Sequence, residues 1–155
     1  MSSTEIYVGC GLRSEAIANR FLNGYAPKRS AVADEYPFPE FVDFPEVVYK
    51  TECELIDRLM LEPLSSYSIY WDCEGDAEQV MLFFTADGHM IAGVGGPKSS
   101  FEKTLSELRD LVEGRFGYVT EGSCPPESFR DFEQLSRSSS LPCIVDGQLL
   151  NRNKL

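Results

Sequence analysis

The most regular pattern of apolar and polar positions lies in the middle of the chain. Residues 68–73 and 79–85 are apolar runs of strand length, and Asp87-Gly88 is the favoured pair for a two-residue type I′ turn into a third run at 89–94. Together they predict a three-stranded antiparallel meander, which Gly95-Gly96-Pro97 ends.

Four other segments carry apolar residues about one helical turn apart. The expected helices run from Glu15 to Leu22, from Thr51 or Glu52 to Met60, from Ser99 to about Phe116, and from Glu127 to Ser136. Ser14 is the expected N-cap of the first helix, and Ser99 with Glu102 forms a capping box for the third. Pro125-Pro126 is expected to open the fourth.

The remaining segments are shorter or irregular. Residues 5–9 and 46–49 are expected to be short strands, and 143–150 an edge strand or a small hairpin at Asp146-Gly147. Proline is expected to exclude regular structure from the aromatic stretch 36–45, which we interpret as an ordered loop packed on the body or held for a partner.

The order of these elements indicates the fold class. No internal repeat is present, and strands and helices do not alternate as in a parallel sheet. We expect a single α+β domain over residues 1–155, with an antiparallel or mixed sheet, a central three-stranded meander and helices mainly on one face. The tail, 151–155, is expected to fray.

Size and composition favour a cytoplasmic protein that folds without a stabilising disulfide bond or metal ion. A chain of 155 residues can bury about 70% of its unfolded surface, which is enough for one core. The first residues lack the basic and apolar regions of a secretory signal, and the longest apolar run, Val80–Phe84, is far too short to span a bilayer. We expect no export and no membrane partner.

Cysteine and histidine usage argues against a metal site or another cofactor. The five cysteines form no Cys-x-x-Cys pair, and His89 is the single histidine. An odd set without close pairs is typical of reduced thiols, which we interpret as small buried hydrophobic residues. The cysteines are Cys10, Cys53, Cys73, Cys124 and Cys143.

The net charge of −11 comes entirely from one third of the chain. Residues 31–80 contain 13 of the 25 acidic residues but only Lys50 and Arg58 of the 14 basic residues, so the rest of the chain is balanced. Such a segment repels nucleic acid and attracts a basic protein. The alternative is a solvated face that keeps the protein soluble.

Three features invite an enzymatic interpretation, and each has a simpler explanation. Gly9-x-Gly11 lacks the third glycine of a nucleotide-binding fingerprint, so a plain strand-to-helix turn is favoured. His89 lies beside Asp87, whose side chain is expected to serve the turn, and no motif supplies a nucleophile. The acids of 72–78 fit a polar hairpin loop better than a carboxylate pair or a cation site. We therefore predict no catalytic residue.

Aromatic residues cluster in and beside the acidic third. Tyrosine, tryptophan and phenylalanine anchor protein interfaces, although about half of these residues are expected to fill the core instead. The cluster comprises Tyr36, Phe38, Phe41, Phe44, Tyr67, Tyr70 and Trp71. The predicted partner-binding residues are Tyr70, Asp72, Glu74, Asp76, Glu40, Asp43 and Phe41.

The central segment resembles a known class of protein. It has an aromatic strand ending Tyr70-Trp71-Asp72, then the run 81–88, Gly93 and a long amphipathic helix, and this layout is similar to that of small acidic immunity proteins encoded beside bacterial polymorphic or type VI secreted toxins. The resemblance covers about residues 68–132. It implies binding to one cognate toxin in the cytoplasm, occlusion of its active site by acids, and no catalytic residue.

Two other functional classes stay open. An adaptor or chaperone for a secreted protein would show several partners and no toxic neighbour. A small ligand-binding domain or enzyme would need a pocket around Gly9–Ser14 or His89. In every case we expect a monomer or a weak homodimer.

Overall fold

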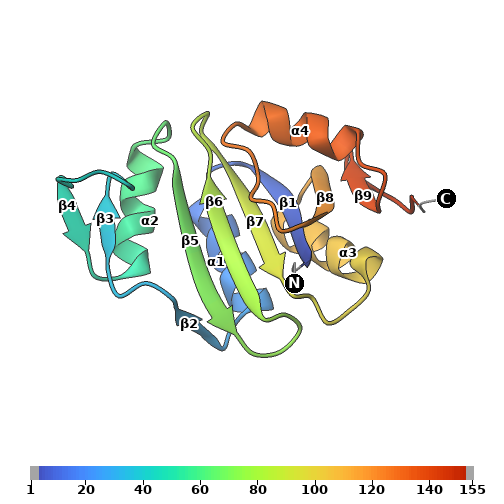
Figure 1. The fold of residues 1–155 in the computed structure, drawn as a ribbon, viewed down its shortest axis with the longest axis horizontal. Coiled ribbons are helices and arrows are strands. Elements are labelled where there is room, and N and C mark those ends of the chain that lie inside the picture. Colours follow the sequence, from blue (N-terminus) through green and yellow to red (C-terminus); the bar gives the residue numbers. More distant parts are fainter. Residues whose placement is uncertain (1–3, 153–155) are drawn as a thin grey trace.

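The computed structural model describes residues 4–152, which form a large antiparallel sheet, a two-stranded sheet and four helices (Figure 1). In chain order the elements are β1 (Thr4–Leu12), α1 (Glu15–Tyr25), β2 (Arg29–Ala31), β3 (Tyr36–Phe38), β4 (Val47–Tyr49), α2 (Glu52–Leu61), β5 (Tyr67–Cys73), β6 (Gln79–Phe84), β7 (His89–Gly95), α3 (Phe101–Val112), β8 (Phe116–Glu121), α4 (Phe129–Arg137), β9 (Cys143–Val145) and β10 (Gln148–Leu150). None of the helices among residues 4–152 is long and apolar enough to cross a membrane.

The large sheet is built around β1. Its strand order is β10-β9-β8-β1-β7-β6-β5-β2, and every pairing is antiparallel. Alternate residues of β1 face opposite sides, so Ile6 and Val8 enter the larger core while Tyr7 enters the smaller one. The predicted α+β class with an antiparallel sheet is confirmed.

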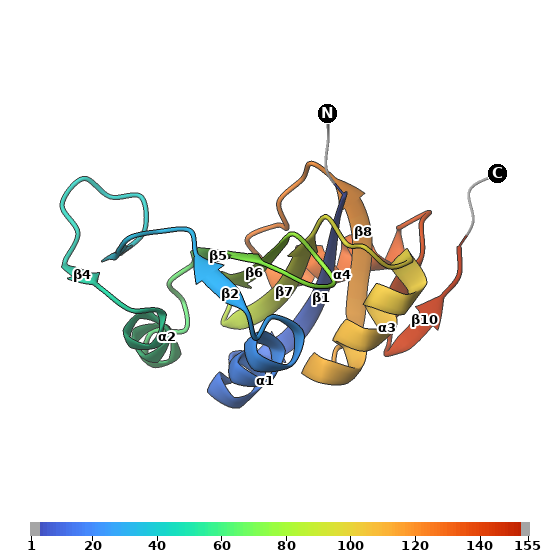
Figure 2. The same ribbon diagram turned by 90° about the horizontal axis from the view of Figure 1, so that it is seen from below.

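Helices cover the two faces of the sheet unequally. Helices α1, α2 and α3 lie along one face, where the larger core forms (Figure 2). On the opposite face α4 packs against β8, β9 and β1, and Phe129 and Phe132 join the smaller core. This leaves the outer face of β5 beyond the reach of α4, which becomes important for the candidate site.

The central meander forms as predicted, but its second turn is different. A type I′ turn needs positive φ at both central residues, and here only Gly88 has it, at +86°. The Gly88 N–H donates to the Thr85 carbonyl and the Thr85 N–H to the His89 carbonyl, which makes a three-residue loop. The predicted small hairpin at Asp146-Gly147 has both φ values positive and joins β9 to β10.

The third helix is shorter than predicted. Ser100, not Ser99, is its N-cap and accepts a hydrogen bond from the Lys103 N–H. The helix ends at Val112 because Glu113 takes a left-handed conformation and Gly114 packs directly on Val8, where a Cβ would lie 2.4 Å from Cγ1. Phe116 therefore begins β8, a strand that the sequence analysis missed.

The prolines also act differently from the prediction. Pro37 lies inside β3, which pairs with β4, because an isolated two-stranded ribbon offers edge positions where no N–H is needed. Pro125-Pro126 does not open α4, since Ser128 caps a helix that starts at Phe129. Residues 153–155, the end of the tail predicted to fray, lie outside the described residues, and Arg152 is held by the Ser139 carbonyl at 2.6 Å.

The Arg13 guanidinium connects the end of β1 to the end of α2 and to the β6–β7 loop. Arg13 donates to the carbonyls of Leu59 (2.6 Å) and Glu62 (2.9 Å) at the end of α2. It also donates to the carbonyls of Ser65 (2.5 Å) and Thr85 (2.8 Å). Burial lowers the pKa of Arg13 to about 10, so it stays charged at neutral pH and complements the carbonyl end of the helix.

Replacing Arg13 by methionine should remove all four bonds, although the Glu62 and Thr85 carbonyls keep the bonds from the Ser65 and Gly88 N–H groups. We expect the free energy of unfolding to fall by about 3 kcal/mol. Urea denaturation followed by the fluorescence of Trp71, the single tryptophan and fully buried, measures it. The control is Arg20→Met, which breaks only exposed contacts, with the Glu113 carboxylate and the Leu111 carbonyl, and should cost less than about 1 kcal/mol. Equal losses in the two variants would contradict this role.

Candidate partner-binding surface

Two phenylalanines stand almost fully in solvent on the loop between β3 and β4. Phe41 and Phe44 are 91% and 93% exposed, in contrast to Tyr36 and Phe38 at the base of the same hairpin, which are buried. We call residues 39–46 the aromatic loop; it projects from one end of the molecule (Figure 2). Neighbouring exposed aromatic side chains cost solvation free energy and mark a surface for contact with another molecule.

The base of the aromatic loop is held firmly by α2. The Arg58 guanidinium lies 4.4 Å from the centre of the Phe38 ring and bonds Glu46 at 2.6 Å, the Tyr49 hydroxyl at 3.2 Å and the Glu62 carboxylate. The Glu46 N–H donates to the Phe38 carbonyl at 2.8 Å and closes the loop. Anchoring of this kind lowers the entropy that the loop would lose on binding.

A mainly apolar hollow of about 310 Å³ lies between the aromatic loop and β5. We call it the aromatic pocket, and four aromatic and two acidic side chains contribute to its wall. It is lined by Val32, Ala33, Glu35, Tyr36, Pro37, Glu40, Phe41, Tyr67, Ser68, Ile69 and Tyr70. A smaller hollow of about 110 Å³ shares Glu40, Phe41, Tyr67 and Ser68 with it and extends toward Glu127.

The pocket exists because the edge of β5 is only partly paired. Strand β2 pairs with Trp71 to Cys73, and the Val32 N–H directly after it donates to the Tyr70 carbonyl at 3.3 Å. Beyond that point the Glu40 carboxylate accepts a hydrogen bond from the Ser68 N–H at 3.1 Å, and the Tyr67 hydroxyl donates to the Pro37 carbonyl at 2.8 Å. Side chains thus bridge the strand edge and leave space between the bridges.

Glu40 is the electrostatically unusual residue of this surface. Burial raises the pKa of its carboxyl group to about 7, and the hydrogen bond from the Ser68 N–H opposes the rise without cancelling it. The proton is therefore held to a higher pH than on an ordinary glutamate. A cation placed beside it would favour the charged form.

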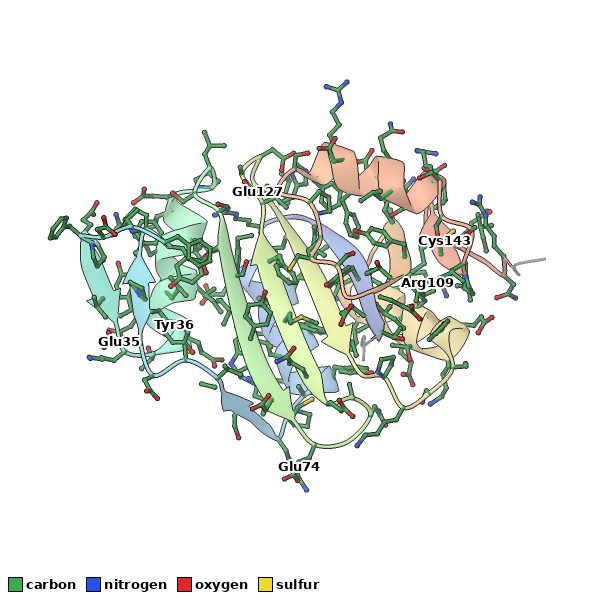
Figure 3. All side chains as sticks on the ribbon, viewed as in Figure 1. Glu35, Tyr36, Glu74, Arg109, Glu127 and Cys143 are labelled. Atoms are coloured by element: carbon green, nitrogen blue, oxygen red, sulfur yellow. The ribbon has the colours of Figure 1, made fainter. Side chains whose placement is uncertain are left out.

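The predicted partner-binding residues divide into two groups. Glu40, Phe41 and Tyr70 line the aromatic pocket together, and Asp43 is exposed on the aromatic loop beside them. Asp72, Glu74 and Asp76 lie instead where β5 ends and turns toward β6, and Figure 3 shows Glu74 at the tip of that turn, away from Glu35 and Tyr36. One continuous patch of all seven residues does not form.

Several acids of the 31–80 segment serve the fold. Glu52 accepts from the Trp71 indole at 2.6 Å and pairs with Arg29 at 3.0 Å, both partly buried. Glu46 and Glu62 pair with Arg58, and Glu35 pairs with Lys50. Within residues 4–152 nine acids of this segment form no ion pair: Asp34, Glu40, Asp43, Glu54, Asp57, Asp72, Glu74, Asp76 and Glu78.

Sequence reasoning missed part of this site. No local sequence pattern pointed to Glu35 or Ser68. Both line the aromatic pocket because tertiary contacts place the chain around residue 35 beside β5. The outward direction of Ser68 and Tyr70 does follow from the alternation of β5, since Ile69 and Trp71 face the helices. Of the seven clustered aromatics, Tyr36, Phe38, Tyr67 and Trp71 are buried, close to the half expected.

The Gly9 turn does not offer a phosphate cradle. A Cβ at Gly9 would lie 2.6 Å from the ring of Phe129, so that ring already fills the space above the glycine. Gly11 has φ of +80° and follows an irregularity in the pairing of β1 with β7. Both glycines are explained by backbone shape and packing.

His89 and Asp87 both contact Phe129 and so hold α4 against the sheet. The His89 ring stacks on Phe129 with centres 4.5 Å apart. The Asp87 carboxylate accepts from the Phe129 N–H at 2.9 and 3.0 Å, so it serves the first turn of α4 as well as its own turn. Partial burial raises the pKa of Asp87, but hydrogen bonds from Thr85 and Phe129 outweigh burial and leave the pKa below its usual value.

The cysteines agree with the prediction only in part. All five are free, but Cys53 and Cys124 are exposed and only Cys143 is buried, so they are not uniformly core residues. Among the residues described, no group of three or more His, Cys, Asp or Glu side chains is placed to hold a metal ion.

Comparison with known proteins adds no relative, because no family model, curated protein or solved structure matches the chain.

The packing role of Gly9 can be tested directly. Gly9→Ala should destabilise the protein by about 1–3 kcal/mol, because Phe129 is stacked between His89 and Phe132 and cannot move freely. Phe129→Leu in the same chain should recover part of that loss, as a double-mutant cycle in urea would detect. Strictly additive losses would show that the ring is not what meets the new methyl group.

Glu40 should make stability depend on pH. The folded protein holds its proton up to about pH 7 and the unfolded chain releases it near 4.5, so the free energy of unfolding falls as pH rises between these values. Relative to Glu40→Gln, the wild type should lose about 1 kcal/mol from pH 5 to pH 8, after allowance for solvent screening. Glu74→Gln, at an exposed position, is the matched control. Parallel wild-type and Glu40→Gln profiles would contradict burial of the carboxyl group.

Proposed function

We propose that this chain is a binding protein that neutralises a cognate bacterial toxin in the cytoplasm, covering the toxin's active site with an acidic and aromatic surface. The toxin is a basic protein, and the complex contains one copy of each chain. The proposal rests on the resemblance of residues 68–132 to small acidic immunity proteins and on the properties of the aromatic loop.

The observation that carries the proposal is the exposure of Phe41 and Phe44 on an anchored loop. Interfaces gain most of their free energy from a few aromatic side chains that become fully desolvated on binding. Asp43 and Glu40 flank these rings, so a basic surface would meet opposite charge at the rim and apolar rings at the centre.

The second acidic group is assigned a different role. Asp72, Glu74 and Asp76 are exposed at the end of β5 and form no ion pair within residues 4–152. Exposed charges at a distance from the contact centre act mainly on the rate of association, through long-range attraction that salt screens.

Co-expression with the product of the adjacent gene tests the proposal. We expect a one-to-one complex at low and moderate salt and the loss of that product's toxicity. No complex and no toxic neighbour would overturn the proposal. Several partners without toxicity would instead favour an adaptor or chaperone.

Substitutions then separate the two acidic groups. Phe41→Ser with Phe44→Ser should weaken the complex by about 2 kcal/mol or more, through faster dissociation. Reversal of Asp72, Glu74 and Asp76 to lysine should slow association about tenfold at low salt. The matched control, Leu135→Ser, removes a half-exposed apolar side chain on the distant α4 and should change neither rate.

A further inference from the structure

The aromatic pocket has a shape that a simple contact surface would not require. A surface that only excludes water can be flat, whereas this hollow has a volume of about 310 Å³. That volume is at the small end of the range for ligand sites and suits one long side chain better than a large ligand. Four aromatic residues and two glutamates are among the residues that line it.

The walls match a planar cation. Tyr36, Phe41, Tyr67 and Tyr70 all line the hollow, and aromatic faces attract cations within about 6 Å of the ring centre. Glu35 and Glu40 line it as well. Glu40 uses one oxygen to accept from the Ser68 N–H, and a carboxylate can accept further hydrogen bonds.

The charge of the Glu40 carboxylate favours a cation over an apolar group as the occupant of the aromatic pocket. A neutral apolar group would bury the Glu40 carboxylate more deeply without compensation. A cation would pair with it, in a segment that carries 11 excess negative charges. A guanidinium is favoured over an ammonium because it stacks on aromatic rings, bonds a carboxylate in a bidentate way and is less strongly hydrated.

From these contacts we infer that the aromatic pocket receives an arginine side chain of the partner, with the guanidinium against the Glu40 carboxylate and its stem along Tyr36 and Tyr70. This assignment rests on the proposed function, because it names the group by which the basic partner is recognised.

The other ionisable groups around Glu40 are three tyrosines, two glutamates and the lysine that pairs with one of them. Tyr36 on β3 and Tyr67 and Tyr70 on β5 also line the hollow, and burial raises the pKa of all three, so they stay protonated between pH 6 and 8. Glu35 lines the aromatic pocket and pairs with Lys50, and Glu127 lines the smaller hollow. Loss of the Glu40 proton therefore accompanies binding, because the guanidinium needs the charged carboxylate.

The test uses the free full-length protein and a small probe. Nα-acetyl-arginine methylamide is titrated into the ¹⁵N-labelled chain, and the backbone amide shifts of Ser68, Ile69 and Tyr70 are followed by NMR. We expect saturable shifts with a dissociation constant on the order of 1 mM, a scale suited to a single side chain. The neutral isostere Nα-acetyl-citrulline methylamide should produce no saturable shift.

Variants and pH provide the second readout. Glu40→Gln should weaken arginine binding about tenfold, and Glu74→Gln, the matched loss of one acid on the distant turn, should leave it unchanged. Affinity should be about tenfold lower at pH 6 than at pH 8, because Glu40 must first lose its proton. Equal binding of citrulline, an unchanged affinity in Glu40→Gln, or no shift with arginine would overturn the inference.

The outcome is distinguishable from failure of the proposed function. Suppose that the Glu40→Gln variant binds the toxin with wild-type affinity and that the free chain does not bind arginine. This result would contradict the pocket assignment but not the neutralising role. Arginine binding without any complex would remove the neutralising role and retain the site.

Discussion

The Arg13 guanidinium is the interaction on which the arrangement of this fold depends. It is the point where the end of β1, the end of α2 and the β6–β7 loop meet, and it donates hydrogen bonds to four backbone carbonyls of these segments and of the loop after α2. Because α2 is fixed there, Arg58 on the same helix is fixed as well, and Arg58 anchors the β3–β4 hairpin. The exposed loop at the end of the molecule is thus positioned, through α2, by the half-buried guanidinium of Arg13.

The candidate surface follows from an incomplete sheet. Eight strands pair in order, but β2 covers only the last part of β5, and α4 covers the sheet at its other end. The exposed length of β5 is closed by side chains instead of by a strand, through the bonds of Glu40 and Tyr67. A strand there would have filled the space, whereas two side-chain bridges leave a pocket beside the strand.

The acidic character of residues 31–80 has two physical roles that the net charge does not separate. Part of it holds the structure, since Glu52 satisfies the buried Trp71 indole and Arg29, while Arg58 gathers Glu46 and Glu62. Most of the rest is exposed and, under the proposed function, would attract a basic partner over a distance. Glu40 belongs to neither group, because it is half-buried beside aromatic rings, where its charge is costly until a cation arrives.

The sequence by itself determined the elements whose signals are local: the central meander from its apolar runs, α1 from Ser14 and helical spacing, and the β9–β10 hairpin from Asp146-Gly147. It also predicted Phe41 and Glu40 as partner-binding residues, and the structure places both at the aromatic pocket. Tertiary structure alone decided where α3 ends, because Gly114 meets Val8 from a distant strand, and which acids became buried partners. It alone formed the pocket, since Glu40 reaches Ser68 across 28 residues of chain, and no local periodicity records a contact between segments so far apart.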